Sequence, residues 1–358
     1  MKLLLHSSID EWLVRLAAVL GGLLVGGLLI TLMGENAWQG YTILFRGALM
    51  NSERLGNTLA TATPLIFTGL SVAFAFRAGL FNIGAAGQML MGGLCATYLG
   101  ASLIWPKAVL LPVMMLTSVT AGALWALLPG LLKARYNVHE VVSGIMLNWV
   151  AYWIVYYAVP IWLRGSFETE SRHLPADASL RVAWLSELFD GSYINLGLLA
   201  ALAAVWVTAF ALDRTVLGFE LKAIGLNRHA AACAGMDAGR GTAIAMIIAG
   251  AWAGLGGMTL YCGYAVSIQI GIFPSQGFDG IAVALLGANS PWGCLAGALF
   301  MGALYSGKGF LNAMTSIPPE LADTIVAVII YFAAASLLIR QFLAAFRAKV
   351  RGVSSCGP

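Results

Sequence analysis

Long apolar runs separated by short polar gaps dominate the pattern of this chain. A helix needs about 20 apolar residues to cross the hydrocarbon core of a bilayer. By that criterion the pattern predicts ten spans, at residues 12–33, 57–76, 81–104, 108–132, 141–163, 194–213, 242–262, 275–290, 292–312 and 321–340. The run at 275–290 is short and the run at 81–104 is rich in glycine, so eight spans with two re-entrant segments remain an alternative. We expect an all-α, polytopic membrane protein with one transmembrane domain over residues 1–358.

Basic residues indicate how the predicted spans are oriented, because cytoplasmic loops carry an excess of Lys and Arg. With a cytoplasmic N-terminus, thirteen of the 20 Lys and Arg residues fall on the inner side and the other seven on the outer side. An even number of spans returns the basic C-terminal segment to the cytoplasm. We therefore expect both termini to be cytoplasmic.

Two connecting loops are longer than the others. Residues 164–193 form the predicted outer loop, and residues 213–241 form a polar cytoplasmic loop that predicts one or two short helices. Five predicted spans precede the outer loop and five follow it. An odd number of spans in each half predicts two halves of inverted topology, a plan common among transporters.

Composition excludes several function classes. The chain is 60% hydrophobic and 10% charged, whereas a soluble domain is about 25% charged. Its five cysteines form no CxxC pair, its four histidines are far apart, and it has no HExxH, GxSxG or complete P-loop motif. The basic residues are scattered rather than gathered for nucleic acid. We expect a non-catalytic membrane protein with no metal, cofactor or nucleic-acid partner.

Charged residues are also scarce inside the predicted spans. Ion-coupled carriers usually hold ionisable side chains at membrane depth, despite a cost of about 2.5–3.5 kcal/mol. Here Asp279 comes nearest, at the outer end of a short predicted span. An ion-coupled secondary carrier therefore remains an alternative that the pattern disfavours.

Two polar, glycine-containing segments interrupt the apolar background. Residues 76–88, FRAGLFNIGAAGQ, predict either a broken or tightly packed helix on a substrate path, or a helix interface with satisfied amides. In residues 276–293, Asp279 and Asn289 are expected to cap a short helix, and Pro291 to start the next one. Asp279 is then either a simple N-cap or a residue facing an outer vestibule.

A third such segment, residues 218–235, lies in the predicted cytoplasmic loop. It predicts a short amphipathic helix, a break at Gly225 and a second, Ala-rich helix started by Asn227. Its apolar side chains Phe219, Leu221, Ile224 and Leu226 suit an apolar groove on a soluble partner. The alternative is a helix lying flat on lipid headgroups.

Together these stretches resemble the permease subunits of ABC importers in the branched-chain amino acid and ribose group. The similarity is greatest to nucleoside permeases that work with basic-membrane-protein-type receptors. It is carried by residues 76–88 (FRAGLFNIGAAGQ), 139–151 (HEVVSGIMLNWVA), 218–236 (GFELKAIGLNRHAAACAGM) and 277–293 (GFDGIAVALLGANSPWG). One departure is Ala86, where relatives often carry Glu.

The resemblance implies a permease of the bacterial inner membrane that forms the path with a second, homologous permease. It implies a cytoplasmic ATPase docked on residues 213–241 and an extracytoplasmic substrate-binding protein. Nucleosides are the implied solutes, with ribose-like sugars or branched-chain amino acids as alternatives. The path is expected to include Phe81, Asn82, Gln88, Asn148, Phe278 and Asp279. ATPase coupling is expected at Gly218, Phe219, Glu220, Lys222, Gly225, Asn227, Ala231 and Gly235.

Overall fold

The computed structural model describes residues 19–32, 34–167, 169–315 and 317–334. The predicted first span, 12–33, and last span, 321–340, therefore lie partly outside the described residues. The described residues are mostly helical. The only β-bridges among them are two isolated ones, Arg164 with Ser171 and Glu170 with Gln269. The all-α class is confirmed for this part of the chain.

The described chain runs as a series of helices of very different length. A first helix covers Val19–Leu32. The others are α2 (Ala37–Leu49), α3 (Ser52–Arg77), α4 (Ala85–Ser102), α5 (Lys107–Tyr136), α6 (Glu140–Trp162), η1 (Ala176–Ala178), α7 (Ala183–Leu188), α8 (Gly197–Arg214), α9 (Val216–Leu226), α10 (Arg228–Cys233), α11 (Ala238–Thr259), η2 (Leu260–Tyr264), α12 (Gln276–Leu286), α13 (Pro291–Met314) and α14 (Pro319–Ala334).

Six helices in the described chain are long and apolar enough to cross a membrane: α3, α5, α6, α8, α11 together with η2, and α13. A seventh is possible if Val19–Leu32 and α2 count as one span bent by 115°. The chain is thus a multi-pass membrane protein, and the count of ten spans stays a prediction. The predicted helix at 81–104 begins later than expected, at Ala85, because residues 78–84 are not helical.

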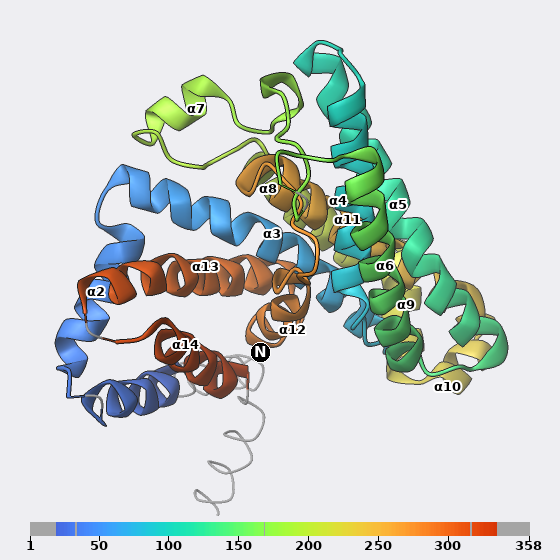
Figure 1. Ribbon diagram of the computed structural model, residues 1–358. Helices are drawn as coiled ribbons and strands as arrows, with labels where there is room; N and C mark the ends of the chain where they lie inside the picture. The colour runs from blue at the N-terminus through green and yellow to red at the C-terminus, as the bar shows by residue number, and fades with distance from the viewer. Residues whose placement is uncertain (1–18, 33, 168, 316, 335–358) are drawn as a thin grey trace, which may run out of the picture. The chain divides into compact units, whose positions relative to one another are not determined.

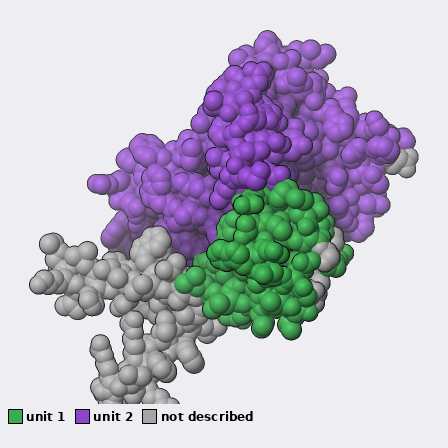
Figure 2. All heavy atoms as spheres, turned by 90° about the vertical axis from the view of Figure 1, so that its left-hand side faces the viewer, with its two compact units in different colours: residues 1–47, 307–358 green, residues 48–306 purple. Residues whose placement is uncertain are grey.

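The chain divides into two compact units, shown in different colours in Figure 2. Unit 1 comprises residues 1–47 and 307–358, and unit 2 comprises residues 48–306. Within the described part of unit 1, Lys308 pairs with Asp323, and the Tyr41 hydroxyl donates to the carbonyl of Leu23. The candidate functional residues all belong to unit 2.

Close helix packing holds the centre of unit 2 together. Helix α11 packs most extensively on α5, and also on α4 and α3. A Cβ added to Gly254 would lie 2.3 Å from the carbonyl oxygen of Ser118, and one added to Gly92 would lie 2.5 Å from the Cα of Gly254. Small residues let helix backbones approach closely in membranes, where packing rather than the hydrophobic effect drives association. Glycine is therefore required where α4, α5 and α11 meet.

The two long loops lie at opposite ends of this bundle (Figure 1). Residues of the 164–193 loop contact the start of α5 through Lys107 and the end of η2 through Gly263. Helices α9 and α10 lie instead near the end of α3 and the start of α11, where Ile224 touches Gly241. The predicted separation of the two loops onto opposite faces is thus matched by the arrangement of unit 2.

Candidate functional site

A nonhelical segment, residues 78–84, connects α3 to α4. Gly79 has a φ of +70°, a conformation that glycine adopts without a Cβ penalty. The N–H groups of Gly79 and Leu80 donate to carbonyls in the last turn of α3. The glycine-containing stretch is therefore interrupted before Ala85, as in the first of the two alternatives given for residues 76–88.

Two buried amides hold this segment in place. Nδ2 of Asn82 donates to Oε1 of Gln88 at 2.8 Å, and Nε2 of Gln88 donates to Oδ1 of Asn82 at 2.9 Å. Nδ2 of Asn82 also donates to the Ser71 hydroxyl on α3 at 2.9 Å. All three residues are buried. The side chains of Asn82 and Gln88 thus satisfy each other between α3 and α4.

The third amide, Asn148 of α6, secures the same segment from the other side. Its Oδ1 accepts from the Gly87 N–H at 2.8 Å, and its Nδ2 donates to the Ile83 carbonyl at 3.0 Å. Asn148 is 3% exposed. The three amides therefore lie on the same segment and are hydrogen-bonded within the protein, which matches the alternative of a helix interface with satisfied amides. Their place on a translocation path stays a prediction.

The other three predicted path residues lie in two places, Phe81 in segment 78–84 and Phe278 and Asp279 in α12. Phe81 packs edge-on against Phe76, with ring centroids 5.2 Å apart. Phe278 is 40% exposed, and Asp279 lies in the first turn of α12. The interpretation of Asp279 as an N-cap was wrong, because Ser275 occupies that position. Pro291 does begin the next helix, α13.

The start of α12 packs against the start of α4. A Cβ added to Gly277 would lie 2.4 Å from the Cα of Ala86, and Ala86 is fully buried. The segments 76–88 and 276–293, which the sequence analysis singled out separately, therefore meet at this contact. The small side chain of Ala86 belongs to a tight helix contact.

Segment 218–235, which is expected in a cytoplasmic loop, forms two helices, as predicted, but the break between them lies elsewhere. Helix α9 continues through Gly225 and ends at Leu226, and Asn227 caps α10 by accepting from the N–H groups of His229 and Ala230. A Cβ on Gly225 would lie 2.4 Å from the Arg77 carbonyl oxygen. Glycine is thus needed there for close approach, and the prediction of a break at Gly225 was wrong.

The apolar residues of α9 divide into two groups. Leu221 and Ile224 are buried within unit 2, whereas Phe219 and Leu226 are 64% and 89% exposed. Lys222 forms an ion pair with Asp213 at 2.7 Å, and Gly218 packs against the carbonyls of Ala211 and Leu212. Only one face of α9 is therefore available to a partner.

The other residues predicted to couple to the ATPase also differ in their exposure. Ala231 of α10 is buried, and Glu220 is partly exposed. Gly235 has a φ of +85° in the turn that follows α10. The positive φ explains the glycine at this turn.

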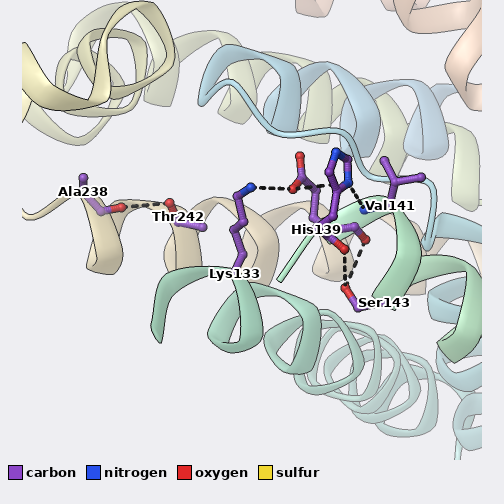
Figure 3. A network of polar contacts seen from close by, with 7 residues as sticks. Lys133, His139, Val141, Ser143, Ala238 and Thr242 are labelled. Carbon is purple, nitrogen blue, oxygen red and sulfur yellow. Dashed lines mark hydrogen bonds and ion pairs between the residues drawn. The ribbon is translucent and has the colours of Figure 1, made fainter. Parts of the chain in front are cut away.

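A polar network that was not predicted lies at the α5–α6 turn (Figure 3). Lys133 pairs with the buried Glu140 at 3.1 Å. His139 accepts the Val141 N–H on its Nδ1, and its carbonyl accepts the Ser143 hydroxyl. The sequence shows a Lys and a Glu at the ends of two neighbouring apolar runs. Their spacing alone does not show that the two side chains form an ion pair.

A second feature that was not predicted is Arg181 in the 164–193 loop. Its Nε donates to the Gly263 carbonyl at 2.8 Å, a terminal nitrogen donates to the Tyr264 carbonyl, and the guanidinium lies 4.6 Å from the centroid of the Tyr193 ring. Gly263 and Tyr264 belong to η2, a π-helical turn, and such turns are frequent at functional sites. Burial lowers the pKa of Arg181 from its ordinary value. Arg181 therefore secures the end of this turn.

Comparison with known proteins identifies the family. The family model described as the branched-chain amino acid transport system / permease component matches residues 54–334. The chain is 38% identical to the guanosine ABC transporter permease protein of Bacillus subtilis, over 95% of this chain and 98% of that protein. It is 37% identical to the nucleoside ABC transporter permease protein of Lactococcus lactis, over 95% of each.

A glucose ABC transporter permease protein of Haloferax volcanii is 32% identical, over 94% of this chain and 91% of that protein. No solved structure matches. The chain therefore belongs to this family of branched-chain amino acid transport system permease components, and the predicted resemblance to ABC permeases is confirmed. It is a permease subunit.

Proposed function

We propose that this chain forms part of the membrane path of an ATP-driven importer for nucleosides. The observation that carries the proposal is the nearly full-length similarity to two permeases named for guanosine and nucleosides. The sugar permease that is 32% identical keeps ribose-like sugars as the second candidate. Branched-chain amino acids are the third, because the family model is described by them.

The proposed assembly places a second, homologous permease beside this chain and an ATPase on residues 213–241. The exposed Phe219 and Leu226 of α9 support the ATPase contact, because exposed apolar side chains suit a groove on a partner. An extracytoplasmic binding protein would deliver the solute at the end of unit 2 that carries residues 164–193. Ten spans in two inverted halves, cytoplasmic termini and a bacterial inner membrane complete the proposal.

The proposed path passes the contact between α4 and α12. Phe278 is exposed there, and Asp279 lies in the same turn of α12. Phe81 adjoins the engaged amides Asn82 and Gln88. We assign Asn82, Gln88 and Asn148 to the path as the residues that hold segment 78–84, whose movement would open it.

Reconstitution tests this proposal. The permease pair, its ATPase and its binding protein are placed in proteoliposomes, and ATP-dependent uptake of guanosine, ribose, glucose and leucine is compared. We expect guanosine uptake that requires ATP and all partners. Uptake of another solute class alone would overturn the nucleoside assignment. Uptake by this chain alone, driven by a membrane potential without ATP, would establish an ion-coupled carrier instead.

A further inference from the structure

A cavity of about 490 Å³ opens between η2 and the start of α12. Its lining includes Tyr261, Tyr264, Gln269, Phe273, Ser275 and Gln276. The volume lies within the range of about 300–1,000 Å³ typical of small-molecule sites. None of these residues was among the path residues expected from the sequence.

The outer loop braces one wall of this cavity. The Ser171 N–H donates to the Ile268 carbonyl at 2.9 Å, and the Ile270 N–H donates to the Thr169 carbonyl at 2.9 Å. The Ser171 hydroxyl also accepts the Ile268 N–H at 2.9 Å. Gln269 lies between these anchored residues, so its backbone is held while its exposed side chain is left to reach a solute.

The polar side chains named above as lining the cavity lack hydrogen-bond partners in the described chain. Within the described chain, the hydroxyls of Tyr261, Tyr264 and Ser275 and the amides of Gln269 and Gln276 form no hydrogen bond. The predicted amides Asn82, Gln88 and Asn148 are, in contrast, fully engaged. A Gln amide both donates and accepts, so it suits the edge of a heterocyclic base or the hydroxyls of a sugar. The cavity therefore offers a solute free hydrogen-bonding groups, whereas the predicted amides are already bonded within the protein.

Aromatic rings adjoin the cavity and continue along α6. The ring of Phe273 lies 5.1 Å from that of Trp149, 4.9 Å from that of Tyr152 and 6.2 Å from that of Phe278. Flat ligands stack favourably on such rings. The row of rings therefore leads from the cavity to Phe278, one of the predicted path residues.

The exposed side chains of α6 include aromatic rings at mid-span beside aliphatic ones such as Ile145 and Met146. Trp149 and Trp153 are 50% and 48% exposed, and they lie about 13–20 Å along a helix of 23 residues. Trp and Tyr concentrate at membrane interfaces rather than at mid-span. The exposed face of α5 instead carries Leu116, Leu124 and Leu128. The aromatic face of α6 therefore suits a polar or aromatic contact better than hydrocarbon.

We propose that this cavity is the outward solute site and that it binds a nucleoside, with the base stacked on Phe273 and polar edges bonded to Gln269 and Gln276. The assignment rests on the proposed import function. The lining residues include no Asp, Glu, Lys or Arg, so a zwitterionic amino acid would find no counter-charges. An uncharged solute with a flat ring and several hydroxyls matches the lining.

The test uses the complete importer in proteoliposomes and measures the KM and maximal rate of guanosine uptake. Gln276→Leu, Gln269→Leu and Phe273→Leu are compared with Gln39→Leu, which removes an exposed amide from α2 in unit 1. We expect KM to rise tenfold or more in the three cavity variants and to stay unchanged in the control. Binding-protein docking, ATPase activity without solute and co-purification of the second permease should persist in all four.

The experiment distinguishes failure of the proposed function from failure of the cavity assignment. Wild-type importer that takes up no nucleoside contradicts the proposed function itself. Wild-type uptake with unchanged KM in all three cavity variants overturns the cavity while leaving that function intact. Loss of the second permease from the Phe273→Leu complex would assign the aromatic face to permease pairing and equally overturn the site. Competition by free base and by ribose then shows which half of the solute each residue contacts.

Discussion

Gly225, in the last turn of α9, lies directly against Gly79 in the nonhelical segment that follows α3. A Cβ added to Gly79 would approach the Cα of Gly225 to 3.0 Å. Arg77, two residues before Gly79, donates from Nε to the Asn289 carbonyl beyond α12 at 2.9 Å. The helix proposed to dock the ATPase is thus in contact with the segment held by the buried amides.

Gly225→Ala should weaken the coupling between ATP hydrolysis and solute transport. In Gly225→Ala the new Cβ would lie 2.4 Å from the Arg77 carbonyl oxygen, so α9 must move away from residues 77–79. We expect solute uptake by the reconstituted importer to fall at least tenfold while ATPase binding persists, measured as transport per ATP hydrolysed. The control is Gly309→Ala on α13, where an added Cβ meets open space. Normal transport in Gly225→Ala would show that this contact does not transmit coupling.

Asn148→Leu should destabilise the protein without changing solute recognition. The substitution removes the acceptor of the Gly87 N–H and the donor to the Ile83 carbonyl. Each buried group left unpaired costs about 1–3 kcal/mol. We expect a lower thermal unfolding temperature in detergent and an unchanged KM in the surviving importer. Met146→Leu, an exposed position on the same helix, is the control, and a raised KM without loss of stability would place Asn148 in contact with the solute.

Lys133→Met should leave the buried carboxylate of Glu140 without its partner. Glu140 is 8% exposed and its carboxylate lies 3.1 Å from Lys133. Because Lys133 remains partly solvated, we expect a loss of about 1–3 kcal/mol, below the full cost of breaking a buried ion pair. Thermal unfolding of both single variants and of Lys133→Met combined with Glu140→Gln measures the coupling. Strictly additive effects would contradict a direct interaction.

Arg181→Lys should loosen the outer loop. Arginine reaches two carbonyls and the Tyr193 ring at once, and a lysine ammonium cannot reproduce that planar geometry. We expect faster proteolysis within residues 164–193 and a several-fold higher KM for solute, since the loop braces the cavity wall. Arg172→Lys provides the comparison, because Arg172 bonds to the Ala101 carbonyl instead. Equal protease resistance in wild type and Arg181→Lys would refute the role.

The membrane class, the helices that overlap the predicted spans and the two long loops followed from the sequence alone, whereas helix α2 (Ala37–Leu49) was not predicted. Apolar run length is a local property, so each predicted span overlaps a helix in the described part of the chain. The same holds for Asn227 as the start of α10 and Pro291 as the start of α13. Caps and helix-starting prolines act on neighbouring backbone groups, which are close in the sequence. The caps predicted for α12 were nevertheless wrong, because this helix starts after Ser275 and ends before Gly287.

The roles of the polar residues depended on the tertiary structure, because their partners are distant in the chain. Asn148 meets Gly87 across 61 positions, and Arg77 meets Asn289 across 212. Glycine is required at position 225 because the backbone of residue 77 lies close to it. The conformation of α9 itself does not require glycine there. The nonhelical segment 265–275 carried no motif, yet folding gathers its residues around a cavity with uncommitted amides. Sequence spacing determined which residues were helical and apolar, whereas three-dimensional packing decided which polar groups were already paired and which remained for a solute.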